Sequence, residues 1–156
     1  MKHKIFIRNL LEGSESDLRL KLLAGEAGLD KEIPEAEINR PGLSLTGFFD
    51  FFAYDRIQIF GKGETAYIKN FSEEKQREIF ETFFSYDLLC CIFTHSDHPS
   101  RLFLEYANNK NVPVLFTEHP TTRFVSMLPH LVTPAHAPTT TVDGTLVDVF
   151  GNGLLL

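Results

Sequence analysis

Residues 88–116, LLCCIFTHSDHPSRLFLEYANNKNVPVLF, decide the fold of this chain. The run Leu88–Thr94 is almost entirely apolar and of strand length, which is typical of a strand that a parallel sheet buries on both faces. Ser100–Asn109 follows with its apolar residues at helical spacing, and Val112–Phe116 is a second short apolar run. A strand, a helix and a strand in this order predict a βαβ unit, in which the two strands lie parallel.

Two elements on the amino-terminal side extend this unit. Arg56–Phe60 alternates polar with apolar residues and contains β-branched side chains, so we predict a strand that Gly61–Gly63 closes. Ser72 is a candidate N-cap, and glutamates follow it in the first turn of a helix. Apolar residues then recur on one face of that helix: Ile79, Phe80, Phe83 and Phe84. The chain is therefore predicted to be an α/β fold, with a largely parallel central sheet flanked by helices.

The flanking segments give weaker patterns. We expect a helix over Ile5–Leu11, a helix or short strand over Asp17–Leu23 and a glycine-rich turn over Gly25–Pro34. Glu35–Asn39 is extended in character, because Pro41 disfavours helix at the residue before it and makes Arg40–Gly42 a turn. Residues 121–130 are helical in pattern, with Phe124, Leu128 and Leu131 expected to point inward.

The carboxyl-terminal part of the chain suggests a domain boundary. Thr133–Pro138 contains two prolines and reads as a linker. Residues 139–156 read as a strand, a turn and further strand-like runs that end at three leucines. We therefore expect one α/β domain over residues 1–132, a linker over 133–138, and over 139–156 a short β segment that begins a second, truncated domain.

Composition restricts the classes of function. The chain has 156 residues and a net charge of −6, and its lysines and arginines form no large cluster, which argues against nucleic acid or an anionic membrane as partner. It contains no apolar stretch long enough for a signal region or a membrane span. Its two cysteines, Cys90 and Cys91, are adjacent in the apolar run and are predicted to be reduced core residues on opposite faces of a strand. A cytoplasmic location is expected.

The aromatic residues are unusual, with fifteen phenylalanines and no tryptophan. Their densest point is residues 48–52, Phe-Phe-Asp-Phe-Phe. Because phenylalanine is usually buried, we interpret this cluster as core packing in preference to a binding surface.

Several motifs in order resemble one family. Residues 38–43 (INRPGL), 46–52 (TGFFDFF) and 55–64 (DRIQIFGKGE), then 121–124 (TTRF) and 140–154 (TTVDGTLVDVFGNGL), look like the amino-terminal domain of HPr kinase/phosphorylase. One departure is Asp143, where the family usually has histidine before the glycine. The resemblance implies a fold like that of the amino-terminal domains of Mur ligases.

The resemblance also implies a parent enzyme. Such an enzyme phosphorylates a serine of HPr, the phosphocarrier protein of bacterial sugar uptake, with ATP or pyrophosphate and Mg²⁺, and reverses the reaction by phosphorolysis. The family runs this chemistry in a carboxyl-terminal domain, through a G-x-x-x-x-G-K-[ST] phosphate loop that this sequence lacks. The chain is therefore expected to be an inactive amino-terminal regulatory or assembly domain, without catalytic residues or cofactor of its own, from a homo-oligomer that is hexameric in the family.

Two alternatives remain open for its role: a stand-alone module that binds a small molecule or nucleotide, and a purely structural interaction domain. The candidate ligand-binding residues are polar side chains in turn-like motifs beside the sheet: Asn39, Arg40, Thr46, Lys62 and Arg123. For Arg40 and Arg123, internal pairing with carbonyls or carboxylates is the favoured alternative. Lys62 is read as a surface lysine in a turn, although a helix terminus around Glu64 could meet an anion.

Two further clusters carry less weight. His95–His98 contains two histidines and an aspartate after a strand, but a polar loop with an N-cap explains the same residues, and no metal site is predicted. Cys90 and Cys91 are not expected to act as nucleophiles, since burial raises the pKa of a thiol.

Overall fold

The computed structural model describes residues 4–12, 18–34, 37–95 and 98–132. The predicted linker and the segment 139–156 therefore lie outside the described residues. The elements in chain order are α1 (Ile7–Glu12), β1 (Lys21–Ala24), η1 (Glu26–Gly28), β2 (Ile38–Asn39), α2 (Gly42–Leu45), β3 (Ile57–Phe60), α3 (Lys62–Lys69), α4 (Glu73–Phe83), β4 (Cys90–Phe93), α5 (Arg101–Lys110), β5 (Val114–Phe116) and α6 (Thr121–Val132).

The strands form one five-stranded sheet in the order β1-β5-β4-β3-β2. Strands β2, β3, β4 and β5 are parallel, and only β1 runs antiparallel, on the edge beside β5. In the central pairs Gln58 lies opposite Cys91, and Cys91 lies opposite Val114. The predicted α/β fold and the predicted βαβ unit are both confirmed.

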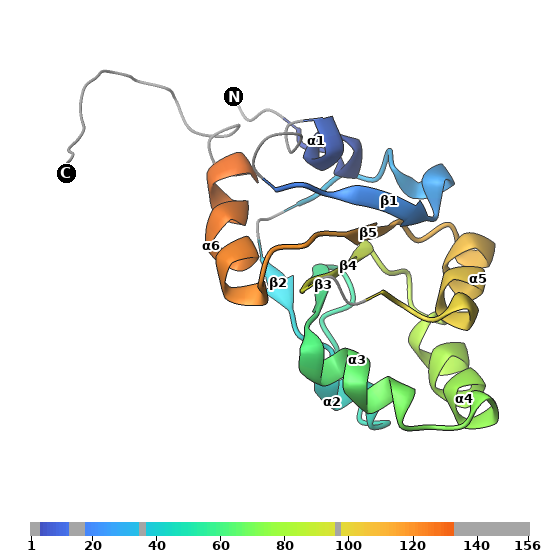
Figure 1. Cartoon of the computed structure of the whole chain (residues 1–156). Coiled ribbons are helices and arrows are strands. Elements are labelled where there is room, and N and C mark those ends of the chain that lie inside the picture. Colours follow the sequence, from blue (N-terminus) through green and yellow to red (C-terminus); the bar gives the residue numbers. More distant parts are fainter. Residues whose placement is uncertain (1–3, 13–17, 35–36, 96–97, 133–156) are drawn as a thin grey trace, which may run out of the picture.

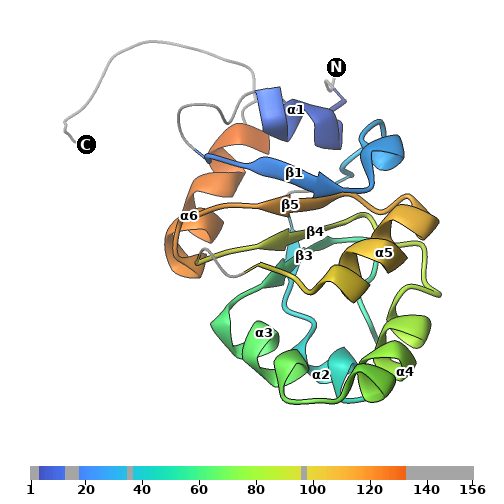
Figure 2. The ribbon, with the colours of Figure 1, turned by 45° about the vertical axis from the view of Figure 1, so that its right-hand side comes forward.

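Helices cover both faces of this sheet, as Figures 1 and 2 show from two directions. The helices that connect successive parallel strands, α2 to α5, pack on one face, whereas α1 and α6 pack on the other. Because β2, β3, β4 and β5 are neighbours in chain order, each connection advances by one strand in the same direction. The carboxyl ends of the four parallel strands consequently lie along one edge of the sheet.

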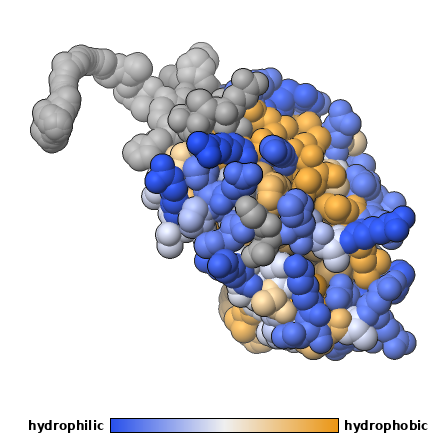
Figure 3. Space-filling view, viewed as in Figure 1, coloured by the Kyte–Doolittle hydropathy of each residue, from blue (hydrophilic) through white to orange (hydrophobic). Residues whose placement is uncertain are grey.

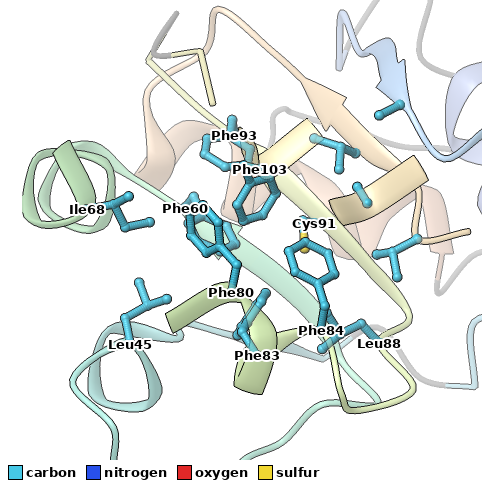
Figure 4. Packing of buried hydrophobic residues seen from close by; sticks show 14 of the residues in the cluster. Leu45, Phe60, Ile68, Phe80, Phe83, Phe84, Leu88, Cys91, Phe93 and Phe103 are labelled. Carbon is cyan, nitrogen blue, oxygen red and sulfur yellow. The ribbon is translucent and has the colours of Figure 1, made fainter. Parts of the chain in front are cut away.

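The two faces carry different cores. Under α2 to α5 the core is largely aromatic, with Phe60 stacked on Phe93 at 4.5 Å between ring centroids and Phe80 edge-on to Phe103 at 5.2 Å (Figure 4). Under α1 and α6 the core is mostly aliphatic and is built from Ile7, Leu10, Leu18, Ile57, Ile59, Ile92, Leu115, Phe124 and Leu128, among others. Cys91 belongs to the first core and Cys90 to the second, as the alternation of a strand predicts.

Helix boundaries follow from capping groups in the sequence. The Oγ of Ser72 accepts a hydrogen bond from the N–H of Lys75, and the Oγ of Ser100 accepts one from the N–H of Phe103, both at 3.2 Å. Helix α5 ends at Lys110 and is followed by the C-cap residue Asn111, whose φ of 57° is left-handed. The helices predicted at both positions are confirmed.

The strand Ile57–Phe60 differs from its alternating pattern, because all four of its residues are buried. Gln58 is fully buried, and its amide donates to the carbonyls of Ala53 at 2.7 Å and Arg56 at 3.1 Å. A polar residue in a strand thus indicates here an internal hydrogen-bonding role and not a face open to solvent.

The phenylalanine cluster corrects another expectation. Phe52 is buried and Phe49 packs partly against the aromatic core, but Phe48 is half exposed and Phe51 is fully exposed. The prediction of core packing is therefore wrong for these two residues. In the space-filling view polar residues cover most of the face, and apolar colour gathers over β1 and at the lower end around α2 (Figure 3). Among the described residues, no helix is both long enough and apolar enough to cross a membrane.

Candidate functional site

Polar side chains gather at the edge of the sheet where the parallel strands end. Arg40 follows β2, Gly61 follows β3, Thr94 follows β4, and Thr121 begins α6 shortly after β5. Open α/β sheets bind ligands at this edge. We call the groups that meet here the carboxyl-edge network: the side chains of Arg40, Glu64, Thr94, His95 and Thr121, and the backbone of Gly61.

An ion pair with a buried carboxylate and a half-exposed guanidinium forms one half of the network. The guanidinium of Arg40 donates from Nε to Glu64 Oε2 at 2.8 Å and from Nη2 to Glu64 Oε1 at 2.9 Å. The backbone N–H of Gly61 donates to the same Oε1 at 2.9 Å. Glu64 is buried, whereas the side chain of Arg40 remains half exposed. The carboxylate is thus held by both an arginine and the first turn of α3.

These contacts change both pKa values. Burial acts to raise the pKa of Glu64, but the hydrogen bonds from Arg40 and from the backbone N–H groups of Glu64 and Gly61 outweigh burial and lower it. Hydrogen bonding to Glu64 raises the pKa of Arg40. Both groups are therefore charged at neutral pH, and the positive end of α3 is already neutralised by a residue of its own first turn.

Gly61 is needed for this close approach. A Cβ at this position would lie 2.8 Å from Arg40 Nη2 and 2.8 Å from Thr121 Oγ1, closer than such atoms approach in proteins. Its backbone is extended, so the requirement is for space and not for an unusual φ. The glycine that the sequence suggested as part of a turn in fact allows α3, α6 and the residue after β2 to meet.

Two threonines and a histidine form the other half of the network. Thr94 Oγ1 donates to the carbonyl of Phe60 at 3.2 Å, and Thr121 Oγ1 lies 2.6 Å from Thr94 Oγ1. Either of the two hydroxyls can be the donor in this short contact. The strand ends of β3 and β4 are thereby joined to the first residue of α6.

His95 connects the same helix a second time. The backbone N–H of Thr121 donates to His95 Nε2 at 3.1 Å. The backbone N–H of His95 donates in turn to the carbonyl of His119 at 2.9 Å, and His95 has a left-handed φ of 64°. The amino terminus of α6 is therefore held by both the side chain and the backbone of the residues after β4.

The structure brings four of the five predicted site residues to this edge and leaves one elsewhere. Asn39 donates from Nδ2 to Gln58 Oε1 at 2.7 Å, and Arg40 pairs with Glu64, which confirms internal pairing for Arg40. Lys62, the first residue of α3, and Arg123, in the first turn of α6, are exposed. Thr46 instead ends α2, where its Oγ1 donates to the carbonyl of Leu43 at 2.6 Å.

Sequence reasoning did not assign Glu64, Thr94 or Thr121 to the site. Arg40 and Glu64 are far apart in the chain, and no local pattern links them. A threonine that ends an otherwise apolar strand is a usable signal for Thr94, because a hydroxyl there can bond a neighbouring strand end.

The other candidate groups do not form a reactive site among the described residues. No cluster of three or more potential metal ligands occurs in the part of the chain that the structure describes. His98 stacks its ring on Phe116 at 4.2 Å, and Ser96 and Asp97 lie outside the described residues. Burial raises the pKa of the Cys90 thiol to about 12 and that of Cys91 well above its usual value, as expected for thiols in a hydrophobic core.

A solved structure shares the fold of this chain. The CBS and DRTGG domains from the regulatory region of Clostridium perfringens pyrophosphatase, solved with the activator diadenosine tetraphosphate, match with a TM-score of 0.52 and 16% identity. The match covers 81% of this chain and 47% of that one. At this identity the likeness concerns the fold alone.

Sequence relatives are much closer. Proteins named HPr kinase/phosphorylase from Leptospira biflexa, Treponema pallidum and Geobacter sulfurreducens are 53%, 41% and 35% identical to this chain over 140, 139 and 150 residues. The matches cover 89–96% of this chain but only 44–47% of those proteins, so the chain spans less than half of their length. The family model described as HPr Serine kinase N terminus matches residues 5–131. This chain therefore belongs to the family of HPr serine kinase amino-terminal domains.

Proposed function

We propose that this chain is the amino-terminal regulatory and assembly domain of a bacterial HPr kinase/phosphorylase. The observation that carries the proposal is the family match over residues 5–131, together with relatives of that name that extend well beyond the matched region. Phosphoryl transfer needs groups that cradle phosphates and neutralise developing charge. The described site offers instead a carboxylate already paired with its arginine, which supports a role other than catalysis.

The activity of the whole protein belongs to the same proposal. The parent transfers a phosphoryl group to a serine of HPr from ATP or pyrophosphate, with Mg²⁺, and removes it by phosphorolysis in the regulation of carbon metabolism. HPr contacts the part of the parent that follows this domain. The parent assembles as a homo-oligomer, a hexamer, in the cytoplasm. This chain binds none of the cofactors itself.

The carboxyl-edge network supplies a physical route for regulation. It fixes the first residue of α6 to the ends of β3 and β4, and residues 133–156 follow α6 in the chain. A contact that changes this network would shift the amino terminus of α6. Lys62 and Arg123 are the proposed contact points, because they are exposed while Asn39 and Arg40 are paired internally.

The full-length Leptospira biflexa relative allows a direct test. The segment that matches residues 5–131 is removed, and phosphoryl transfer to HPr, phosphorolysis and the mass of the assembly are measured. We expect the chemistry to persist, while the balance of the two activities or the oligomeric state changes. A deletion that alters neither would contradict the proposal, as would phosphorylation of HPr by the 156-residue chain alone.

Point variants of the relative separate the edge from the rest of the domain. Substitution by alanine at the positions matching Lys62 and Arg123 is expected to change the balance of kinase and phosphorylase activity. The matched control is alanine at the position of Lys110, an exposed lysine at the end of α5. If the control variant changed the balance of the two activities equally, the carboxyl edge would have no specific role in regulation.

A further inference from the structure

We propose that the segment Leu43–Tyr54, here called the aromatic loop, docks against a second copy of this chain. Every large hydrophobic residue that is exposed among the described residues lies in this segment: Leu43 (63% exposed), Phe48 (47%), Phe51 (101%) and Tyr54 (41%). Exposed apolar residues that occur singly need no explanation, but such a concentration marks an interaction surface.

The loop is held from beneath by aromatic contacts. Phe49 stacks on Tyr86 at 5.4 Å between ring centroids, and Phe52 meets Tyr86 edge-on at 5.0 Å and Phe83 at 5.5 Å. The exposed residues are thus carried by a base that is packed into the aromatic core. Docking on such a base loses little conformational entropy, because the loop is already in place.

Phe51 is the most unusual residue of the loop. Its side chain is fully exposed. Its φ of 63° lies in the left-handed region, which residues other than glycine, asparagine and aspartate rarely adopt. Neither feature stabilises the folded chain by itself. A strained residue that presents an apolar ring to solvent is a reason to look for a function at that position.

A groove lies beside this exposed ring. A cavity of about 220 Å³ opens between α2, α3 and α4, and its apolar lining comes from Leu45, Phe49, Tyr67 and Ile79. Phe49 lines the groove and is two residues from Phe51, so a projecting ring and a groove occupy neighbouring parts of one surface. A two-fold axis can then place the ring of each copy in the groove of the other, which is the geometry of an isologous dimer.

The available area fits a modest dimer. A buried aromatic side chain covers about 150–250 Å², so the four exposed residues together supply on the order of 500 Å² per copy. Standard interfaces bury about 800 Å² per partner. The groove lining and the polar residues around it can supply the remainder, which places the expected complex at the weak end of the range.

Charge also favours a second copy as the partner. Asp50, next to Phe51, is exposed, and the charged residues that line the groove are Lys75 and Glu78. When the ring of one copy enters the groove of the other, Asp50 is brought toward Lys75 of its partner, and the two-fold axis forms this pair twice. Glu78 lines the same groove and pairs with Lys75 at 3.6 Å, but both side chains are exposed, so Lys75 can leave Glu78 for Asp50 of the partner at little cost.

This inference rests on the proposed function only in its assembly part, for which it names the interacting surface. Its test is the mass of the 156-residue chain measured by sedimentation from micromolar to millimolar concentration. We expect a reversible shift from monomer toward dimer, weakened at least about tenfold by Phe51→Ser, as for an aromatic hot spot. A chain that stays monomeric throughout, or a dimer that Phe51→Ser does not weaken, would overturn the proposal. Neither result would affect the regulatory test in the full-length relative.

A charge exchange identifies the docking geometry. Asp50→Lys and Lys75→Asp are each expected to weaken the dimer, and the double variant to restore it, because the pair reforms with opposite sign. Lys110→Asp, at an exposed position on α5, is the matched control and should leave the mass unchanged. Thermal unfolding of each variant shows that it is folded. Additive losses in the double variant would exclude the Asp50–Lys75 contact and with it this geometry.

Discussion

The carboxyl-edge network and the aromatic loop differ in whether their side chains find partners within the chain. At the edge, charged and polar groups satisfy one another: Glu64 accepts from Arg40 and Gly61, and Thr121 bonds both Thr94 and His95. In the loop, apolar side chains that ordinarily enter a core face solvent. The polar residues at the carboxyl edge thus serve mainly to join elements, while the exposed large hydrophobic side chains lie in the loop.

The largest expected loss of stability distinguishes a buried from an exposed phenylalanine within the loop. Phe52→Ala should lower the free energy of unfolding by about 3–5 kcal/mol, because it removes a buried ring from the aromatic base. Phe48→Ala, at a half-exposed position, should lower it by about 1 kcal/mol or less. Chemical denaturation measures both. Equal losses would mean that the loop is not divided into a buried base and an exposed surface.

Loss of the buried carboxylate is the next largest effect. Glu64→Ala should lower the free energy of unfolding by about 2–4 kcal/mol, since Arg40 and the N–H of Gly61 lose their acceptor. Because the Arg40 side chain is half exposed, water can hydrate its guanidinium in the variant. The loss of stability should therefore be smaller than for a fully buried pair. The control is Glu105→Ala, which removes an exposed pair with Arg101 and should change stability by less than about 0.5 kcal/mol. A small loss at Glu64 would show that the network does not stabilise the edge.

Acid should weaken the carboxyl edge through Glu64. The pKa of Glu64 is lower in the folded chain than its ordinary value of about 4.3, so its contribution is complete above that ordinary value and is lost as pH falls through the folded pKa. Glu64→Gln should therefore reduce the dependence of stability on pH below about 4.3. Unfolding curves at a series of acidic pH values measure this. An unchanged pH dependence would show that Glu64 is not the group that titrates.

The smallest expected effect has the opposite sign. Phe51→Gly relieves the left-handed backbone and should raise the free energy of unfolding by up to about 1 kcal/mol, because the gain in φ freedom exceeds the added entropy of the unfolded chain. The same variant should dimerise less. A variant that is both less stable and more weakly associated would indicate that Phe51 packs within its own chain.

The fold was predictable from the sequence wherever a pattern was local. The run Leu88–Thr94, the cap Ser72 and the helical spacing of apolar residues in Ser100–Asn109 predicted a central strand and two helices, and the structure confirms them. Each of these signals depends on neighbours in the chain, such as a hydroxyl placed before a helix or apolar residues at a fixed period.

The site was less predictable, because its contacts cross long stretches of sequence. Arg40 was a candidate. Its partner Glu64 can be identified only when it is known that β3 lies beside β2 and that α3 begins at Lys62. The exposure of Phe48 and Phe51 was missed for a related reason. Residue type predicts average burial, whereas the position of a loop on the surface depends on the packing of Phe49 and Phe52 beneath it.

A dilution series of the ¹⁵N-labelled chain followed by amide chemical shifts tests most directly that the aromatic loop, and not the carboxyl edge, meets the second copy. We expect shifts that depend on concentration for residues 43–54 and for the groove lined by Tyr67, Lys75 and Ile79, while the amides of Glu64, Thr94 and Thr121 stay constant. Concentration-dependent shifts centred on the carboxyl edge, or none in the loop, would contradict this division of the molecule.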